Sequence, residues 1–277
     1  MAEVGLEVDL RRTLLAGGLT LYYQPIVDLA TGRPEGVEAL VRWHHPTRGL
    51  LGPDQFVGLA ERAGLSDDLT RWVLGAALDD QSAFEQEVGR PLHIAVNVGP
   101  PSVTSRLPLL VDEALAQRSV PPGRMTVEVT ETALFSAADD PAGVLAALRS
   151  AGVSVALDDF GTGFSSLSLL ARMPVDVVKV DRSFVSRIEG AGDELALVRG
   201  LLQLCRTLRI RSVAEGVETQ SQAELLLAMG ADLAQGYLYA RPMPREDVCR
   251  WLAERSPGRP VPAARRSGSG GPQPPAR

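Results

Sequence analysis

The feature that most constrains the fold is a regular alternation of short apolar strands and helices, from about residue 91 onward. One strand and one helix together take roughly thirty residues, the length typical of a parallel βαβ unit. The expected strands are His93–Val98, Met125–Val129, Val153–Leu157, Asp176–Val180, Ile210–Ala214 and Ala231–Tyr239. The expected helices are Leu107–Ala116, Pro141–Ser150, Leu195–Leu208, Gln222–Met229 and Glu246–Ala253.

The first 90 residues add two more strands, at Leu19–Ile26 and Gly36–Trp43, after a short amphipathic helix at 4–17. Two helices, Pro53–Gly64 and Leu65–Val88, follow them. About eight strands joined by helices favour an α/β fold of the TIM type, a closed (β/α)8 barrel. In such a barrel the functional residues lie at the carboxyl ends of the strands.

Composition fits one large domain and disfavours binding to a nucleic-acid polymer. The chain has 277 residues, of which 45% are hydrophobic and 22% charged, enough for a sizeable α/β core. Its total net charge is −6, and the four arginines of residues 256–277 leave −10 on the rest of the chain. A body this acidic repels a phosphate backbone, and it would need bound cations to receive an anionic substrate.

Compartment and domain organisation follow from what the sequence lacks. No apolar run is long enough to span a bilayer, and the N-terminus has no apolar signal core. The two cysteines, Cys205 and Cys249, suit a reducing compartment. We therefore expect a cytoplasmic protein without a membrane segment. It would consist of a barrel domain over residues 1–255 and a disordered tail over residues 256–277, rich in Pro, Gly, Ser and Arg.

The stretch VSVALDDFGTGFSSL, residues 153–167, carries the strongest chemical signal. An apolar strand ends in two adjacent carboxylates, Asp158 and Asp159, and glycines follow at positions 161 and 163. Two acids at the end of a buried strand repel each other, and each costs desolvation free energy unless a cation or strong donors neutralise it. A metal ion is the simplest neutraliser.

Polar residues also stand at or near the ends of the other expected strands. With the two aspartates, the set is Asn97, Glu128, Asp158, Asp159, Lys179, Glu215 and Gln235. Carboxylate and amide oxygens, without clustered His or Cys, favour a hard cation such as Mg²⁺ or Mn²⁺ over zinc. Glu38 lies inside the strand Gly36–Trp43, where the pattern leaves open whether it faces solvent or the site.

Two of these residues are also unusual in composition. Lys179 is the only lysine among 28 basic residues, and Asn97 is the only asparagine. A lysine kept in an arginine-rich chain indicates a need for a compact ammonium that a planar guanidinium cannot imitate. An asparagine offers a carbonyl ligand that adds no charge.

The glycine-containing stretch also resembles a motif from a different class of protein. Gly161 to Ser166 follows a strand, as a dinucleotide-binding loop of an oxidoreductase does, and Asp181 lies about twenty residues further on. The third glycine of that motif is missing, and Asp158 and Asp159 would repel a pyrophosphate. The sequence therefore disfavours a nicotinamide- or flavin-binding enzyme.

Eight ordered blocks of the sequence resemble one known family. They are QPI (Gln24–Ile26), EALVRWHHP (Glu38–Pro46), VNV (Val96–Val98), VEVTET (Val127–Thr132), LDDFGTGFSSL (Leu157–Leu167), VDVVKVDRSFV (Val175–Val185), VAEGVET (Val213–Thr219) and QGYLYARPMP (Gln235–Pro244). Over about residues 7–254 the chain is similar to the EAL-domain family of cyclic di-GMP phosphodiesterases. The resemblance implies a modified (β/α)8 barrel with an antiparallel first strand. It also implies metal-dependent hydrolysis of cyclic di-GMP, a bacterial second messenger, to linear pGpG.

The resemblance implies a metal site that holds two ions, Mg²⁺ or Mn²⁺. The positions that hold the metal are matched by Glu38, Asn97, Glu128 and Asp158. Asp159 matches a position close to a second ion. Lys179 matches the lysine that contacts the attacking water, and Glu215 the acid proposed as a general base or metal ligand.

Other matched positions lie around the substrate or support a loop. Glu131 matches a glutamate that braces the loop after Asp159. The positions around the dinucleotide are matched by Gln24, Arg42, Glu218 and Gln235. Two departures, Gly99 where serine is frequent and Phe164 where tyrosine is common, remove no ligand.

The resemblance leaves a second function to weigh. Members of the family that lose metal ligands act as catalytically silent cyclic di-GMP receptors that signal through a protein partner. The full ligand set in this sequence favours the enzyme over the receptor. The family also suggests a homodimer.

Overall fold

The computed structural model describes residues 2–136, 140–161, 170, 172–190 and 192–255. The tail predicted at residues 256–277 therefore lies outside the described residues. So do residues 162–167 of the LDDFGTGFSSL block, including Phe164.

Ten strands of the described residues form one sheet. They are β1 (Leu19–Asp28), β2 (Pro34–His45), β3 (Gly49–Leu51), β4 (His93–Asn97), β5 (Met125–Thr130), β6 (Ser154–Phe160), β7 (Val177–Val180), β8 (Arg211–Ala214), β9 (Leu233–Ala234) and β10 (Met243–Pro244). The predicted strands are confirmed, with β9 much shorter than expected. The edge strands β3 and β10 were not predicted.

The sheet closes on itself because β1 pairs with strands from both ends of the parallel series. Strands β2, β4, β5, β6, β7, β8 and β9 pair in parallel in that order. Strand β1 then pairs antiparallel with both β2 and β9. The result is an eight-stranded barrel with an antiparallel first strand, which confirms the predicted fold. Strands β3 and β10 extend β2 and β1 outside the ring.

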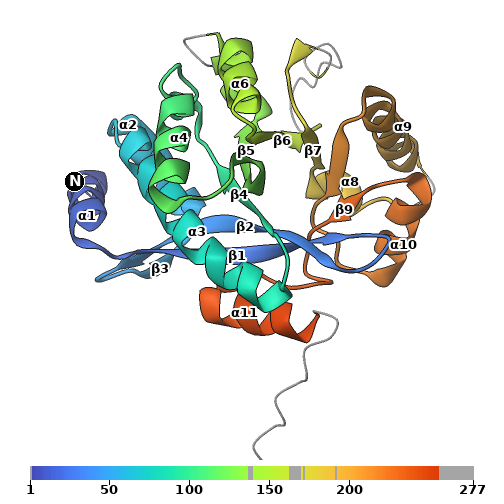
Figure 1. Ribbon diagram of the computed structural model, residues 1–277, viewed down its shortest axis with the longest axis horizontal. Coiled ribbons are helices and arrows are strands. Elements are labelled where there is room, and N and C mark those ends of the chain that lie inside the picture. The colour runs from blue at the N-terminus through green and yellow to red at the C-terminus, as the bar shows by residue number, and fades with distance from the viewer. Residues whose placement is uncertain (1, 137–139, 162–169, 171, 191, 256–277) are drawn as a thin grey trace, which may run out of the picture.

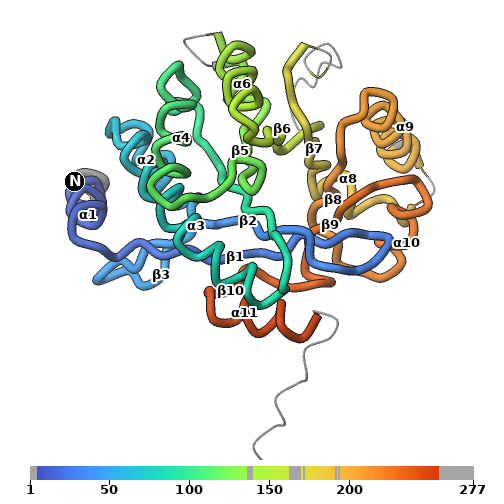
Figure 2. Tube along the Cα trace, in the orientation of Figure 1, coloured from blue at the N-terminus to red at the C-terminus, as the bar shows by residue number. Residues whose placement is uncertain are grey.

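The helices surround the barrel, as Figure 1 shows for α4, α6 and α9 along its outside. They are α1 (Ala2–Ala16), α2 (Val57–Arg62), α3 (Ser66–Val88), α4 (Leu107–Arg118), α5 (Glu131–Ser136), α6 (Pro141–Ser150), α8 (Arg182–Val185), α9 (Asp193–Leu208), α10 (Gln220–Met229) and α11 (Arg245–Glu254). Short 3-10 turns occur at Pro53–Gln55, Pro100–Ser102 and Pro122–Arg124. The tube in Figure 2 shows α1 beside α2, and α11 beneath β1.

In the predicted helices, the apolar residues whose spacing predicted the helix form the face that is buried against the strands. In α3, Leu69, Val73, Ala77 and Phe84 are buried, at the spacing of one helical face. The helix ends at Gly89, whose φ of 67° is a left-handed cap that glycine adopts without strain. The main core lies between the outer face of the barrel and these helices.

Besides β3 and β10, three local structures differ from the sequence prediction, one of them the short helix α8, which was not predicted. The strand expected over Ala231–Tyr239 ends after Ala234, because the chain turns at Gly236 against the backbone of Val217. Helix α5 follows β5 directly, where no helix was predicted. Within the part of the chain that the structure describes, the helices are too short or too polar to cross a lipid bilayer.

Candidate active site at the carboxyl end of the barrel

The inner faces of the barrel strands place apolar and polar residues in two successive layers. A small apolar cluster, Ile26, Ala95, Val213 and Leu233, fills the inside of the barrel. Two residues further along the same strands stand Gln24, Asn97, Glu215 and Gln235. Because side chains two positions apart share one face of a strand, these polar residues lie above the apolar cluster, at one end of the barrel. For β1, which runs the opposite way, the step from Ile26 to Gln24 is toward its N-terminus.

The centre of this polar layer is the ammonium group of Lys179, whose side chain is fully buried. Its Nζ lies 2.8 Å from Glu128 Oε2 and 2.8 Å from Glu215 Oε1. It lies 3.2 Å from Asp158 Oδ1 and 3.5 Å from Glu38 Oε2. Four carboxyl groups from four different strands therefore surround the single lysine of the chain.

Glu38 is held by two neutral amides as well as by this lysine. Asn97 Nδ2 donates to Glu38 Oε1 at 2.6 Å, and Gln235 Nε2 donates to Glu38 Oε2 at 2.7 Å. Gln235 Nε2 also donates to Gln24 Oε1 at 2.9 Å, and Gln24 is the register partner of Glu38 in the β1–β2 pair. Glu38 is buried, so the question that the sequence left open is answered: it points into the site.

A bulge in β6 accounts for two adjacent aspartates at one site. Leu157 pairs with Val178 and Phe160 with Val180, so β6 has one residue more than β7 between these pairs. Asp159 has a φ of 54°, a left-handed conformation that aspartate tolerates better than most residues. Its backbone N–H donates to Asp158 Oδ1 at 2.9 Å. Asp158 is buried and Asp159 is exposed, side by side at the rim.

The acids of the site outnumber its one cation, and their pKa values reflect this. Burial raises the pKa of Glu128 well above its usual range, with the neighbouring Glu38 and Asp158 adding to the rise against the Lys179 ammonium. Burial raises the pKa of Glu215 to about 8, again against Lys179. Burial and then the charges of Asp158 and Asp181 raise the pKa of Asp159.

Two groups of the site are held in their charged forms. For Glu38, burial favours the neutral acid, but Lys179 and the hydrogen bonds from Gln235 and Asn97 outweigh it and lower the pKa. For Lys179, burial favours the neutral amine, but the surrounding carboxylates outweigh it and raise the pKa well above its usual range. The site therefore has more acid than its lysine can neutralise.

The arrangement of oxygens fits divalent cations. One group, Glu38, Glu128 and Asp158, has carboxylate oxygens that all lie within 4.8 Å of one another. A second group with the same spacing is Asp158, Asp159 and Glu215, so Asp158 belongs to both. A donor set of carboxylates suits a hard, oxygen-preferring cation.

Two cavities open beside this cluster, and Leu40 lines both. The first, of about 210 Å³, is lined by Gln24, Glu38, Leu40, Arg182, Glu215, Gly216, Glu218, Gln235, Gly236 and Tyr237. The second, of about 250 Å³, is bordered by Asn97, Gly99, Thr130 and, from α2, Glu61. Each cavity thus combines residues of the cluster with residues that the sequence had not assigned to it.

Sequence reasoning missed the residues of these walls that lie on helices and loops. A Cβ at Gly99 would lie 2.8 Å from Glu61 Oε1, so the absence of a side chain at Gly99 makes room for that carboxylate. Glu61 follows the apolar face of its helix like many solvated acids, and nothing in the sequence marks it. Tyr237 lies next to a matched residue, Gln235, but was not singled out.

Three matched residues lie outside the central cluster. Arg42 is half-buried on β2, with its Cζ 5.4 Å from the centre of the Tyr22 ring, and donates to the carbonyl of Val41. Glu218 forms an ion pair with Arg182, with 2.8 Å between Glu218 Oε1 and a guanidinium nitrogen, and both residues line the first cavity. Glu131 is buried at the start of α5, and the loop that it was expected to brace lies in residues 162–169, outside the described residues.

Comparison with known proteins gives one consistent result. The family model described as the EAL domain matches residues 7–242. The cyclic di-GMP phosphodiesterase NbdA of Pseudomonas aeruginosa is 42% identical over 245 residues, covering 87% of this chain and 31% of that protein. The chain spans about a third of the length of the curated relatives that it matches, with shares from 30% to 40%.

Solved structures agree. The phosphodiesterase of Pseudomonas aeruginosa MucR in complex with cyclic di-GMP has a TM-score of 0.81 and 40% identity, covering 88% of this chain and 99% of that one. The EAL domain of Mycobacterium smegmatis DcpA has a TM-score of 0.72 and 33% identity, covering 89% and 99%. A closed barrel with an antiparallel first strand, an acidic cluster at its carboxyl end and these matches lead to one conclusion: the chain belongs to the EAL domain family.

Proposed function

We propose that this protein hydrolyses cyclic di-GMP to linear pGpG and requires Mg²⁺ or Mn²⁺ to do so. The observation that carries the proposal is the surplus of buried acid around one lysine. Four carboxyl groups converge on Lys179, and two overlapping groups of carboxylates have the spacing of metal sites. A site with this surplus gains more from bound cations than from any neutral ligand. The complete set of ligands also favours the enzyme over a silent receptor.

The residues that would hold the ions divide between the two groups of carboxylates. Glu38, Glu128 and Asp158, with the adjacent Asn97, would hold one ion, and Asp158, Asp159 and Glu215 the other. Two divalent ions at such a site neutralise the charge of the phosphodiester and generate a nucleophile from water at neutral pH. The side chain of Asn97 would turn its oxygen toward the ion, since an amide can present either group.

The chain's own residues would position and polarise the reactants. Lys179 is a fixed positive charge beside the carboxylates that would hold the ions, and Glu128 and Glu215 hold its Nζ in place at 2.8 Å. With cations bound beside it and Lys179 2.8 Å away, the carboxyl of Glu215 would be ionised and able to accept a proton from the nucleophilic water. The charge on Lys179 stabilises the negative charge that develops at the phosphate.

The remaining matched residues would receive the dinucleotide. Gln24 and Gln235 form one wall of the first cavity and Glu218 another. The Oε1 atom of Gln235 is buried and has no hydrogen-bond partner among the described residues, so it is available to a donor on the substrate. Arg42, on the same face of β2 as Glu38, can reach a phosphate oxygen through its planar fork. Glu131 would support the loop after Asp159.

The test is turnover of cyclic di-GMP by the purified protein, with pGpG followed by chromatography, in Mg²⁺, in Mn²⁺, in Ca²⁺ and in EDTA. We expect pGpG in Mg²⁺ and Mn²⁺ and none in EDTA. Calcium should inhibit, because its longer bonds and looser geometry misplace the water. Robust turnover in EDTA would contradict a metal-dependent mechanism. Binding of cyclic di-GMP without turnover in any metal would identify a receptor instead. The homodimer stays a prediction, which sedimentation of the same preparation checks.

A further inference from the structure

The wall of the first cavity contains an exposed aromatic residue that has no assigned role. Tyr237 borders the cavity together with Glu38, Glu215 and Gln235, and its side chain is 43% exposed. On the described chain it is one of few large apolar side chains exposed to this extent, and it is the one at the mouth of the acidic cluster. An aromatic ring in such a place offers a flat apolar surface to whatever enters the cavity.

The backbone holds Tyr237 in a fixed position. The carbonyl of Gln235 accepts from Val217 N at 3.1 Å, and Leu238 N donates to the carbonyl of Val217 at 2.9 Å. The intervening Gly236 lies so close to this backbone that an added Cβ would be 2.2 Å from the Val217 oxygen, so only glycine fits there. Tyr237 thus stands on a turn that hydrogen bonds pin on both sides, and ordering it on binding costs little entropy.

A cation covers part of the ring. The Cζ atom of Arg241 lies 3.9 Å from the centre of the Tyr237 ring, the distance of a stacked guanidinium. Arg241 is itself exposed and follows that turn in the chain. A guanidinium on one face of a ring fixes the ring's orientation and leaves the other face for a second planar group.

Resting on the proposed function, we propose that Tyr237, backed by Arg241, is a stacking platform for one guanine base of the dinucleotide. The base would lie on the ring, and the phosphodiester would lie over the acidic cluster that borders the same cavity. Stacking of a base on an aromatic side chain is sequence-tolerant and worth a measurable share of binding free energy. The platform would therefore contribute affinity, while groups such as Glu218 and Gln235 read the edge of the base.

The experiment compares four single variants with the wild type: Tyr237→Phe, Tyr237→Leu, Arg241→Ala and Leu227→Ala. Leu227 on α10 is 42% exposed and does not border the cavity, so its truncation is a matched control. The measurements are KM and kcat for cyclic di-GMP in Mg²⁺, and the fluorescence of a cyclic dinucleotide that carries 2-aminopurine in place of one guanine. Stacking quenches that fluorescence, whereas a change confined to folding does not.

We expect Tyr237→Phe to behave as the wild type, because it keeps the ring. Tyr237→Leu keeps an apolar side chain but not a flat one, and should raise KM about 10-fold or more. Its kcat should change little, because the platform binds ground state and transition state alike. Quenching should weaken in the leucine variant alone. Arg241→Ala should raise KM less than Tyr237→Leu, and Leu227→Ala should not change it.

Two results would overturn the platform while leaving the proposed function in place. One is a Tyr237→Leu variant that hydrolyses cyclic di-GMP with the wild-type KM and quenches 2-aminopurine as the wild type does. The other is a loss of affinity in Arg241→Ala that exceeds the loss in Tyr237→Leu, which would assign the contact to the charge of Arg241. A wild-type protein that neither binds nor hydrolyses cyclic di-GMP overturns the proposed function itself.

Discussion

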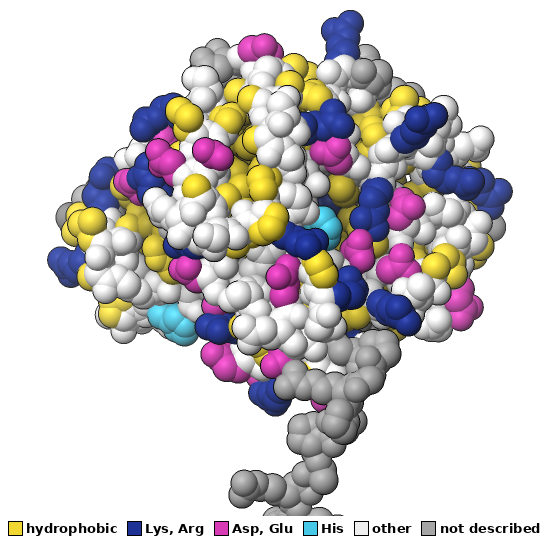
Figure 3. Space-filling view, in the orientation of Figure 1, with side chains coloured by type: hydrophobic (Ala, Val, Ile, Leu, Met, Phe, Trp, Pro, Cys, Tyr) yellow, Lys and Arg dark blue, Asp and Glu magenta, His cyan; other side chains and the backbone are white. Residues whose placement is uncertain are grey.

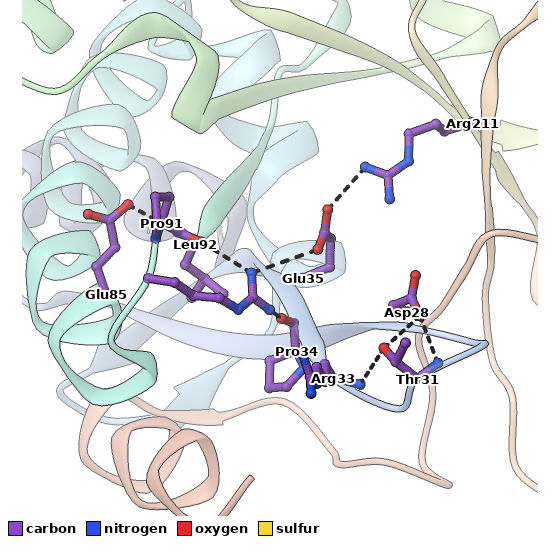
Figure 4. Close-up of polar contacts among 10 residues, drawn as sticks. Asp28, Thr31, Arg33, Pro34, Glu35, Glu85, Pro91, Leu92 and Arg211 are labelled. Carbon is purple, nitrogen blue, oxygen red and sulfur yellow. Dashed lines mark hydrogen bonds and ion pairs between the residues drawn. The ribbon is translucent and has the colours of Figure 1, made fainter. Parts of the chain in front are cut away.

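The two ends of the barrel differ in their balance of acidic and basic side chains. At the amino-terminal end of the strands, which we call the floor, Glu35 lies 3.2 Å from Arg211 and 3.9 Å from Arg90. Figure 4 shows the side chains of Glu35 and Arg211 pointing toward each other. Arg90 also donates to the carbonyl of Pro34. The floor therefore has more arginine than acid in this network. At the carboxyl end, four carboxyl groups share one lysine.

The two ends also differ in the burial of their charged groups. Glu35 and its arginines are partly exposed, with Arg211 46% exposed, so water and salt screen the pairs. Lys179 and Glu128 are almost fully buried, so their charges interact strongly and an excess of acid is costly. The space-filling view in Figure 3 shows basic and acidic side chains interspersed on one face of the surface. In the buried cluster, by contrast, four carboxyl groups share one lysine, and a bound cation would relieve that imbalance.

The sharpest way to break this comparison is the same substitution at two positions of β2, one at each end of the barrel. We expect Glu38→Gln to lower turnover of cyclic di-GMP by more than about 100-fold, the scale of losing a charge-stabilising group at a reacting centre. Glu35→Gln, three residues away on the floor, should leave turnover unchanged. Steady-state assays in saturating Mg²⁺ measure both. A Glu38→Gln variant that keeps more than about a tenth of the wild-type rate, a loss below ~1.4 kcal/mol, would mean that Glu38 is not a ligand.

The variant Lys179→Met tests how much of the folding stability depends on neutralising the buried carboxylates at the carboxyl end of the barrel. Lys179→Met keeps the length of the side chain but leaves the buried carboxylates without a cation. Breaking a buried ion pair in this way costs about 3–5 kcal/mol. We expect a large loss of stability in urea unfolding without metal, and a partial recovery when Mg²⁺ is added.

Lys179→Arg separates charge from shape. A guanidinium is larger and planar, and the four carboxyl oxygens lie too close to Nζ for it to occupy the same position. In assays at saturating Mg²⁺, we expect turnover by Lys179→Arg to fall almost as far as turnover by Lys179→Met. Near-normal turnover would show that a positive charge suffices and that the single lysine is an accident of composition.

The pH dependence of the metal-free protein sharpens the comparison further. A carboxyl whose folded-state pKa is raised, as for Glu215 from 4.5 to about 8, binds its proton more tightly in the folded state. Its contribution to stability is therefore full below the unfolded pKa and is lost as the pH rises toward 8. The lowered pKa of Glu38 acts in the opposite direction, but below pH 4.5.

We accordingly expect the Tm of the metal-free protein to fall between about pH 5 and about pH 8, and the increase in Tm caused by Mg²⁺ to grow over the same range. Glu215→Gln should flatten the first trend. Thermal unfolding in EDTA and in Mg²⁺ at several pH values measures both. A Tm that rises steadily across this range without metal would contradict the excess of buried acid.

The smallest effect is expected at the floor. Arg211→Ala removes an ion pair with Glu35 that is nearly half exposed, so screening by water keeps its contribution below about 1 kcal/mol. Turnover should not change, and the effect on Tm should shrink further in high salt. A loss of activity in this variant would mean that contacts on the floor help to position the residues at the carboxyl end of the barrel.

Much of the fold could be predicted because its signals are local. The apolar period of β4 and β5 and the amphipathic face of α3 are written in neighbouring residues, and each predicted element exists. The strand after Ala231 was overestimated, because its end depends on how Gly236 meets the backbone of Val217, a contact between residues that are far apart in the sequence. Helix α5 was missed, since nothing local separates it from the strand before it.

The candidate site divides in the same way. The sequence alone determined which polar residues follow the strands, because parallel strands bring their carboxyl ends to one rim whatever their order. It could not determine the depth or the direction of each side chain. Glu38 stayed ambiguous until the β1–β2 register placed it opposite Gln24, and Asp159 depends on a bulge in β6.

What only the tertiary structure decided is which groups meet. The sequence contains one lysine and many acids, but the convergence of Glu38, Glu128, Asp158 and Glu215 on Lys179 requires closure of the barrel by β1. The packing of α2 brings Glu61 to Gly99, and the turn at Gly236 sets Tyr237 at the mouth of the cavity. Side-chain period is a property of a single strand, whereas these contacts join residues from different strands and helices. Only the packed barrel brings them within reach of one another.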